Sequence, residues 1–301
     1  MLKGLAITPP AIGRISIGRV VERNGKRLPE KDDQFTLTTQ VQSRDGWVLH
    51  PLDDELRKAA GGKLRSIAVR MLFNDPTLNL RADYSLFDRS KGRPVCVGNG
   101  ESCRRRGKDG IEQLPCPGAD NCAFGQGECK AYARLHVLVG DGEGDALGGF
   151  VLRTTSYNTI RTLAARLEYF HAVSGGLLTC MPLELKLRGK STTMSYGTPI
   201  YYVDLIVRTG LTLEQAIEQA RTLDERRRSG GFKQEALDSA AHKGFSNGAF
   251  EELEEDVSAV VEEFFPEAAE ATPPQLVPND LRGRLDAKIK QAAVKGEHMP
   301  C

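Results

Sequence analysis

The residues best suited to chemistry are cysteines in a charged loop with no helix or strand pattern. Residues 102–130 read SCRRRGKDGIEQLPCPGADNCAFGQGECK and hold four of the seven cysteines, Cys103, Cys116, Cys122 and Cys129. Cys96 lies seven positions before the first of them. Thiolates are soft, charged ligands, and Zn²⁺ takes four of them in a tetrahedron. Because clustered cysteines in a reducing compartment favour metal binding over disulfides, the loop predicts a zinc site.

The rest of the loop is consistent with a structural ion. It is rich in Gly and Pro and poor in apolar residues, so metal binding would supply its folding energy. Its basic residues would offset the charge of four thiolates. No C-x-x-C pair is present, which excludes a standard zinc ribbon or finger, and reduced thiols without metal remain the alternative. Cys96 is either a spare thiol or a ligand in place of Cys103. With four thiols available, a closed structural site is favoured over a catalytic one.

Catalytic motifs are not found in the sequence. It has no G-x-S-x-G elbow, no G-x-x-x-x-G-K-[ST] loop and no H-E-x-x-H helix. The acidic residues of GDGEGDALGG (140–149) lack the other ligands of an EF-hand loop, and Asp53 and Asp54 are expected to face solvent. We therefore expect a non-catalytic protein. A zinc hydrolase remains a weaker alternative, because it would need a water-accessible ion.

The elements that must position the loop alternate between strands and helices. In the first half, apolar alternation predicts strands at 15–21, 35–41, 63–73, 80–88 and 134–140, with a turn at Asn24-Gly25 and a short helix at 52–60. In the second half, a strand at 148–155 precedes a helix at 156–176 capped by Ser156 or Asn158. Two antiparallel strands at 177–191 and 199–208 lead to a helix with a Thr212 capping box. This order predicts an α+β fold with a largely antiparallel sheet and a packed helix.

Composition separates two regions. Residues 1–230 are expected to form the α+β core, with the zinc-binding insertion at about 94–131. Residues 231–301 combine an acidic amphipathic segment, a proline-rich linker and a basic terminal segment. The acidic segment AFEELEEDVSAVVEEFF carries seven acidic and no basic residues. Its apolar stripe is a candidate for partner binding, at Phe250, Leu253, Val257, Val261 and Phe264.

Three stretches in the same order resemble the large recombination directionality factors of phage serine integrases. They are GRISIGRVVERNGKRLPEKDDQFTLTTQ, the cysteine loop with the following KAYARLHVLV, and YNTIRTLAARLEYF with the strands after it. The chain is also similar to metal-binding proteins of integrative conjugative elements. The resemblance extends over residues 11 to about 207.

The resemblance implies a non-catalytic accessory protein of a mobile element. Such factors bind a recombinase or integrase and redirect it from integration to excision. The resemblance also implies that Cys103, Cys116, Cys122 and Cys129 hold zinc. The family pattern has further cysteines where this chain has Gly107 and Gly118, which leaves the ligand set open and Cys96 as an alternative ligand.

A nucleic-acid-binding accessory of recombination or repair is the alternative function. Basic clusters could contact DNA within a complex, at Arg104, Arg105, Arg106, Lys186, Arg188 and Lys190. The formal net charge of +1 provides no bulk attraction to DNA. No membrane span and no signal peptide are recognised, so we expect a cytoplasmic protein; the sequence does not indicate its oligomeric state.

Overall fold

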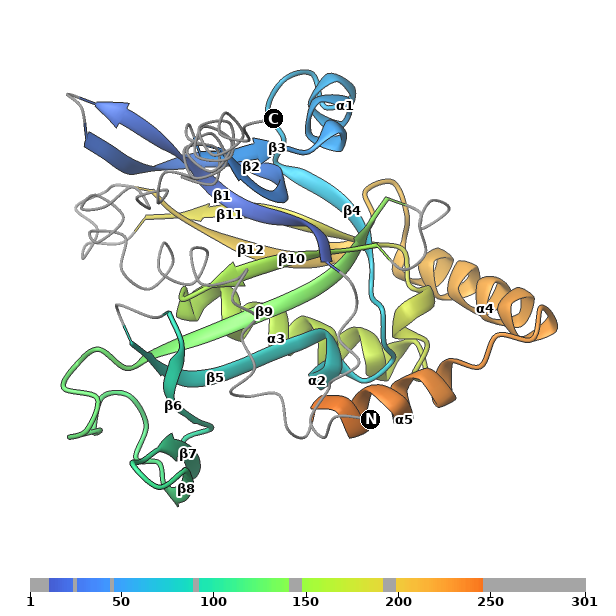
Figure 1. Ribbon diagram of the computed structural model, residues 1–301. Helices are drawn as coiled ribbons and strands as arrows, with labels where there is room; N and C mark the ends of the chain where they lie inside the picture. Colours follow the sequence, from blue (N-terminus) through green and yellow to red (C-terminus); the bar gives the residue numbers. More distant parts are fainter. Residues whose placement is uncertain are drawn as a thin grey trace, which may run out of the picture.

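The computed structural model describes residues 11–23, 26–43, 46–88, 92–140, 148–191 and 199–245 (Figure 1). Its strands are β1 (Ala11–Arg23), β2 (Lys26–Ser43), β3 (Gly46–Leu49), β4 (Ser66–Arg70), β5 (Leu80–Phe87), β6 (Pro94–Gly98), β7 (Ser102–Arg106), β8 (Ile111–Pro115), β9 (Lys130–Val139), β10 (Gly149–Thr154), β11 (Leu183–Lys190) and β12 (Ile200–Val207). Its helices are α1 (Pro51–Ala59), α2 (Pro76–Asn79), α3 (Tyr157–Val173), α4 (Leu213–Ser229) and α5 (Gln234–Phe245).

The strands form one branched sheet. Its main path runs β3-β2-β1-β10-β9-β5-β6-β7-β8, and β4, β11 and β12 branch from β9. Among the described strand pairs, only β1 and β10 run parallel. The predicted α+β fold with a largely antiparallel sheet is confirmed.

Two predicted hairpins are visible in the strand register. β1 and β2 pair down to Arg23 opposite Lys26, the two residues that flank the predicted Asn24-Gly25 turn. β11 and β12 pair from Leu183 opposite Val207 to Lys190 opposite Ile200, as the alternation predicts.

Helix α3 covers the face of the sheet that carries the main hydrophobic core. The Ser156 side chain accepts a hydrogen bond from the Thr159 amide at 3.4 Å, which caps the helix as predicted. The buried side chains of α3 include Leu163 and Leu167, which are 0% exposed and pack into the main core. Burying each of these leucines stabilises the fold by about 1.5–3 kcal/mol.

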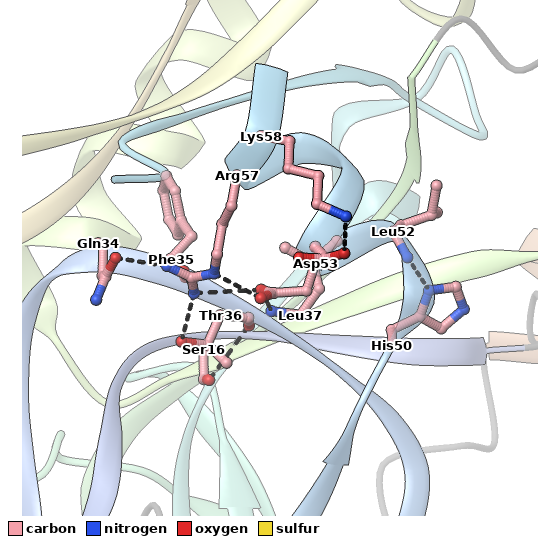
Figure 2. Close-up of polar contacts among 11 residues, drawn as sticks. Ser16, Gln34, Phe35, Thr36, Leu37, His50, Leu52, Asp53, Arg57 and Lys58 are labelled. Carbon is pink, nitrogen blue, oxygen red and sulfur yellow. Dashed lines mark hydrogen bonds and ion pairs between the residues drawn. The ribbon is translucent and has the colours of Figure 1, made fainter. Parts of the chain in front are cut away.

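Helix α1 is fixed to the edge of the sheet by a buried carboxylate (Figure 2). Asp53 is 2% exposed, and its Oδ1 accepts a hydrogen bond from the Leu37 amide at 2.8 Å. Arg57 Nε lies 2.5 Å from Asp53 Oδ2, and Arg57 Nη2 donates to the Phe35 carbonyl at 2.7 Å. The expectation that Asp53 faces solvent is therefore wrong, whereas the Asp54 side chain is 71% exposed.

The last described helix returns to the first half of the chain. Ala241 of α5 is 0% exposed and packs with Phe73 and Leu78. The Asp238 carboxylate accepts a hydrogen bond from the Asn74 amide at 3.2 Å, and His242 Nε2 lies 2.8 Å from Asp75 Oδ2. The division at residue 230 remains a prediction. The acidic segment, the linker and the basic terminal segment lie outside the described residues.

The cysteine loop is more regular than its sequence indicates. β7 and β8 form a hairpin inside it, and β6 joins that hairpin to the sheet. β7 and β8 were missed because polar and charged residues dominate them and their few apolar residues do not alternate. None of the helices described here has the length and apolar character needed to cross a membrane.

Candidate metal centre

Pairing of β6 with β7 brings two cysteines to one face of the sheet. Cys96 lies opposite Arg105, and Gly98 lies opposite Cys103. Residues two positions apart on a strand share a face, so Cys96 and Cys103 project from the same side. Both thiols are buried.

Cys116 comes close to Cys103 because a glycine leaves room for it. The Cys116 amide donates to the Glu101 carbonyl at 2.9 Å, which continues the pairing of β7 and β8 one step beyond Ser102 and Pro115. A Cβ atom added at Gly98 would lie 2.6 Å from the Cys103 Cβ and 2.8 Å from the Cys116 Sγ. The space between Cys103 and Cys116 therefore depends on the missing side chain of Gly98.

Cys122 and Cys129 are held by a chain of tight turns. The Gly125 amide donates to the Cys122 carbonyl at 3.1 Å, and the Glu128 amide donates to the Gly125 carbonyl at 2.7 Å. A Cβ atom at Gly125 would lie 2.8 Å from the Cys129 Cβ. Gln126 takes φ 46°, a left-handed conformation rare for residues other than glycine. The left-handed turn at Gln126 and the close contact of Gly125 with Cys129 direct the chain back, so that Cys129 lies near Cys122.

The five thiols act on one another electrostatically. Burial raises the pKa of Cys103 to about 11, with Cys96 and Cys116 adding to the rise and Arg105 opposing it. Burial likewise raises the pKa of Cys129 to about 11, and thiolates at the other four cysteines add to it. The five cysteines are therefore close enough for their charges to influence one another. A bound cation would reverse this effect and favour thiolates.

Arg105 provides positive charge beside the thiols. Burial lowers the pKa of Arg105. A hydrogen bond to Cys96 and the negative charge of nearby thiolates outweigh this effect, so the pKa is raised overall; the thiolates are those of Cys96, Cys103 and Cys122. Its guanidinium carbon lies 3.8 Å from the centroid of the Phe124 ring. Arg105 is thus directed into the cysteine cluster rather than outward toward DNA.

The donor set fits Zn²⁺ by type, since the cluster offers thiols and two glycines make room beside them. Within the described ranges, no three Cys, His, Asp or Glu side chains are arranged as a metal centre. Which four of the five thiols would serve as ligands remains a prediction. His136 lies on β9, away from this loop, as its strand pattern indicates.

The predicted nucleic-acid contacts are in two places. Arg104 and Arg106 are exposed on β7, while Lys186, Arg188 and Lys190 lie on β11. Figure 1 shows β7 and β11 in well-separated parts of the molecule, so the six residues do not form one patch.

The β11 cations also have partners within the chain. Arg188 Nε lies 3.3 Å from Asp204 Oδ2, and Lys190 Nζ donates to Asn158 Oδ1 at 2.9 Å. Lys186 Nζ lies 3.9 Å from Glu184 Oε1. The two carboxylates offset positive charge at Arg188 and Lys186, whereas the neutral Asn158 amide leaves the charge of Lys190 in place.

Sequence reasoning missed a row of arginines across β5, β9 and β10. Arg81 lies opposite Arg134, and Arg134 lies opposite Arg153. The sequence does place one arginine on each of these predicted strands, next to a leucine that belongs to the core. The row could be recognised only once the register between the strands was known. The predicted partner-binding residues lie outside the described residues: Phe250, Leu253, Val257, Val261 and Phe264.

Comparison with protein families gives a match over most of the described chain. The family model Gp3-like, described as recombination directionality factor-like, matches residues 12–208. The chain belongs to this family. The match runs from β1 to the end of β12 and includes the cysteine loop, whereas α4 and α5 follow it. No curated protein and no solved structure matches the chain significantly. The resemblance to recombination directionality factors is thereby confirmed, and membership of this family indicates a role in DNA recombination by a mobile element.

Proposed function

We propose that this chain is a non-catalytic factor that binds a serine integrase and directs it toward excision. The observation that carries the proposal is the family match over residues 12–208. Interaction with a recombinase or integrase is what the family suggests in general. Binding to a serine integrase in particular, and the direction of the effect, are the proposal.

A structural Zn²⁺ in the cysteine loop is part of this proposal. Gly98 and Gly125 leave room beside the thiols, and Arg105 supplies compensating charge. When bound, the ion would lock the β7–β8 hairpin against the turns at 116–129. A locked loop loses less conformational entropy on docking than a mobile one, so it suits a partner-binding surface. Arg104 and Arg106, exposed on the same hairpin, are positioned to contact an integrase or its bound DNA.

The test is a recombination assay with purified components. A serine integrase encoded on the same element is incubated with excision substrates, with and without this protein. We expect recombinant product only when the protein is present, and a slower migrating band of integrase-bound DNA in a native gel. Steeply salt-dependent binding to random duplex DNA, without any effect on the integrase, would instead favour a nucleic-acid-binding accessory.

Metal dependence is measured on the same samples. We expect Cys116→Ser with Cys122→Ser to lower the zinc content from about one ion per chain to near zero, and to weaken the integrase band at least about tenfold. Cys180→Ser is the matched control, because Cys180 is buried in the main core outside the loop. Unchanged zinc content in the double variant would show that the ion is bound elsewhere.

A further inference from the structure

One side of helix α3 is exposed to solvent along the length of the helix. The buried residues of α3 lie on its other side, which packs against the sheet. An open hollow of about 500 Å³ lies on the exposed side, and it is lined by Arg161, Thr162, Ala165, Arg166 and Tyr169. We call this exposed side, from Tyr157 to Ala172, the α3 face.

Positive charge on the α3 face exceeds what the neighbouring carboxylate offsets. In the part of the chain that the structure describes, the exposed Arg161 guanidinium has neither a hydrogen bond nor an ion pair. Arg166 Nε lies 3.1 Å from Asp204 Oδ1, and Arg188 Nε lies 3.3 Å from Asp204 Oδ2. Two guanidinium groups therefore share one carboxylate, and a third has no carboxylate partner among these residues.

The positive charge extends to the amino-terminal end of α3 and stops short of its other end. Lys190 Nζ donates to the neutral Asn158 side chain at 2.9 Å, so its charge is retained beside the first turn of the helix. At the carboxyl end of the α3 face, the exposed charged side chain is that of Glu168. An anionic partner would therefore bind over the first three turns of α3.

The α3 face also has apolar character. Tyr157 is 62% exposed and Tyr169 is 46% exposed. Ala164 and Ala165 are exposed between them, and side chains this small allow the axis of a second helix to come close. A combination of guanidinium groups, tyrosines and alanines suits an amphipathic acidic helix better than a bare phosphate backbone, which would gain little from the alanines.

The chain itself contains an acidic amphipathic segment of matching length. Residues 250–265, FEELEEDVSAVVEEFF, hold seven acidic residues, no basic residue, and apolar residues at helical spacing. As a helix the segment would be about 24 Å long, close to the about 25 Å of the 17 residues of α3. We propose that residues 250–265 dock as a helix along the α3 face. Their carboxylates pair with Arg161 and Arg166, and their apolar side chains cover Ala165 and Tyr169.

The chain leaves α5 beside the carboxyl end of α3. Glu168 and His171 of α3 line one pocket together with residues of α5 that include Lys243. Helix α5 ends two residues later at Phe245. Residues 246–249 separate it from the segment and can span about 13–14 Å, at about 3.3–3.6 Å each when extended. A segment that starts there runs antiparallel to α3, toward its amino-terminal end. The proposal is independent of zinc and of recombinase binding.

The test is amide hydrogen exchange on the full-length protein, read on peptides that cover 250–265. A synthetic 250–265 peptide is the reference, because it accounts for any helix that the segment forms by itself. We expect exchange at least about tenfold slower in the protein than in the synthetic peptide. With lysines in place of Glu251, Glu252, Glu254 and Glu255, the segment should exchange at the rate of a synthetic peptide that carries the same lysines.

Charge reversal on α3 tests the other side of the contact. Arg161→Glu with Ala165→Glu places two carboxylates in the hollow at exposed positions, so the fold should be retained. Arg166 is left in place because it holds the buried Asp204 carboxylate. We expect this variant to lose the protection of 250–265, and the combination with the four lysines to restore part of it.

The matched control makes the same change in net charge elsewhere. Gln219→Glu with Arg221→Glu alters two exposed residues of α4 and should leave the protection unchanged. Peptides from β9 report in the same experiment whether the sheet is intact. If the α3 variant does not fold, the glutamate-to-lysine variant decides alone, because its substitutions lie outside the described residues.

Three results would overturn the proposal. The first is exchange of 250–265 at the rate of the synthetic peptide in the unmodified protein, or protection that survives both sets of substitutions. The second is protection that rises with protein concentration, which would place the segment on another copy. The third is random duplex DNA whose binding is lost in the Arg161 and Ala165 variant, while exchange of the segment stays the same with and without DNA.

Discussion

Individual polar side chains fasten elements of this fold in addition to the contacts of its apolar core. Asp53 is the clearest case, because one carboxylate joins α1 to β2 through the Leu37 amide and the Arg57 guanidinium (Figure 2). We expect Asp53→Ala to lower the free energy of unfolding by about 3–5 kcal/mol, since it leaves a buried amide and a partly buried cation without their acceptor. Asp54→Ala, at an exposed neighbour on the same helix, should change it by less than about 0.5 kcal/mol. Urea denaturation distinguishes these outcomes, and equal effects would contradict the role given to Asp53.

His136 gives the fold a dependence on pH. Burial lowers its pKa to about 3, with Arg134, Arg153 and Arg81 contributing, whereas the unfolded value is about 6.5. As the pH falls from 6.5 toward 3, the unfolded chain takes up a proton that the folded chain refuses, so stability falls by up to about 1.4 kcal/mol per pH unit. Above pH 6.5 both states are neutral and the effect vanishes.

Replacing His136 isolates this contribution. We expect His136→Gln to flatten the loss of stability between pH 6.5 and pH 4.5 relative to the unmodified chain, measured by urea denaturation at several pH values. His171→Gln is the control, because His171 is only partly buried and bonds to the Asn74 carbonyl on another surface. An identical pH profile for the unmodified chain and His136→Gln would show that His136 titrates normally.

At the scale of elements, α5 is held by one small buried side chain and a few polar contacts. Ala241 is 0% exposed against Phe73 and Leu78, whereas Ala236 on the same helix is exposed. We expect Ala241→Glu to release α5, because it forces a carboxylate into an apolar contact, and to cost about 1–3 kcal/mol. Faster trypsin cleavage at Lys243 would report the release. Ala236→Glu should leave the cleavage rate unchanged, and equal rates for the two variants would contradict this packing.

Most elements could be predicted because their periodicity is local. The helix capped by Ser156 and the β11–β12 pair follow from apolar spacing and turn residues that lie within a few positions of each other. β7 and β8 could not be predicted in this way, since neither strand has aliphatic side chains that alternate along it. The sequence indicated that four cysteines belong together. It indicated Cys96 as an alternative ligand, and the pairing of β6 with β7 places Cys96 on the same face as Cys103.

At the scale of the whole molecule, cross-strand relationships are what the sequence leaves open. The row of Arg81, Arg134 and Arg153 exists because β5, β9 and β10 align at particular residues, and a shift by one residue would turn Arg134 into the core. Asp53 was misread for a related reason. Its acceptor role depends on the Leu37 amide, which lies sixteen positions away along the chain.

The parallel contact between β1 and β10 also determines when the protein can finish folding. Ile15 pairs with Leu152, so the amino-terminal hairpin cannot join β10 until the chain has emerged from the ribosome as far as Leu152. At about 5–20 residues per second, that wait lasts some seconds. The hairpins near the cysteines need only nearby partners and can form during it. Synthesis thus favours completion of the cysteine region before closure of the sheet around the first strand.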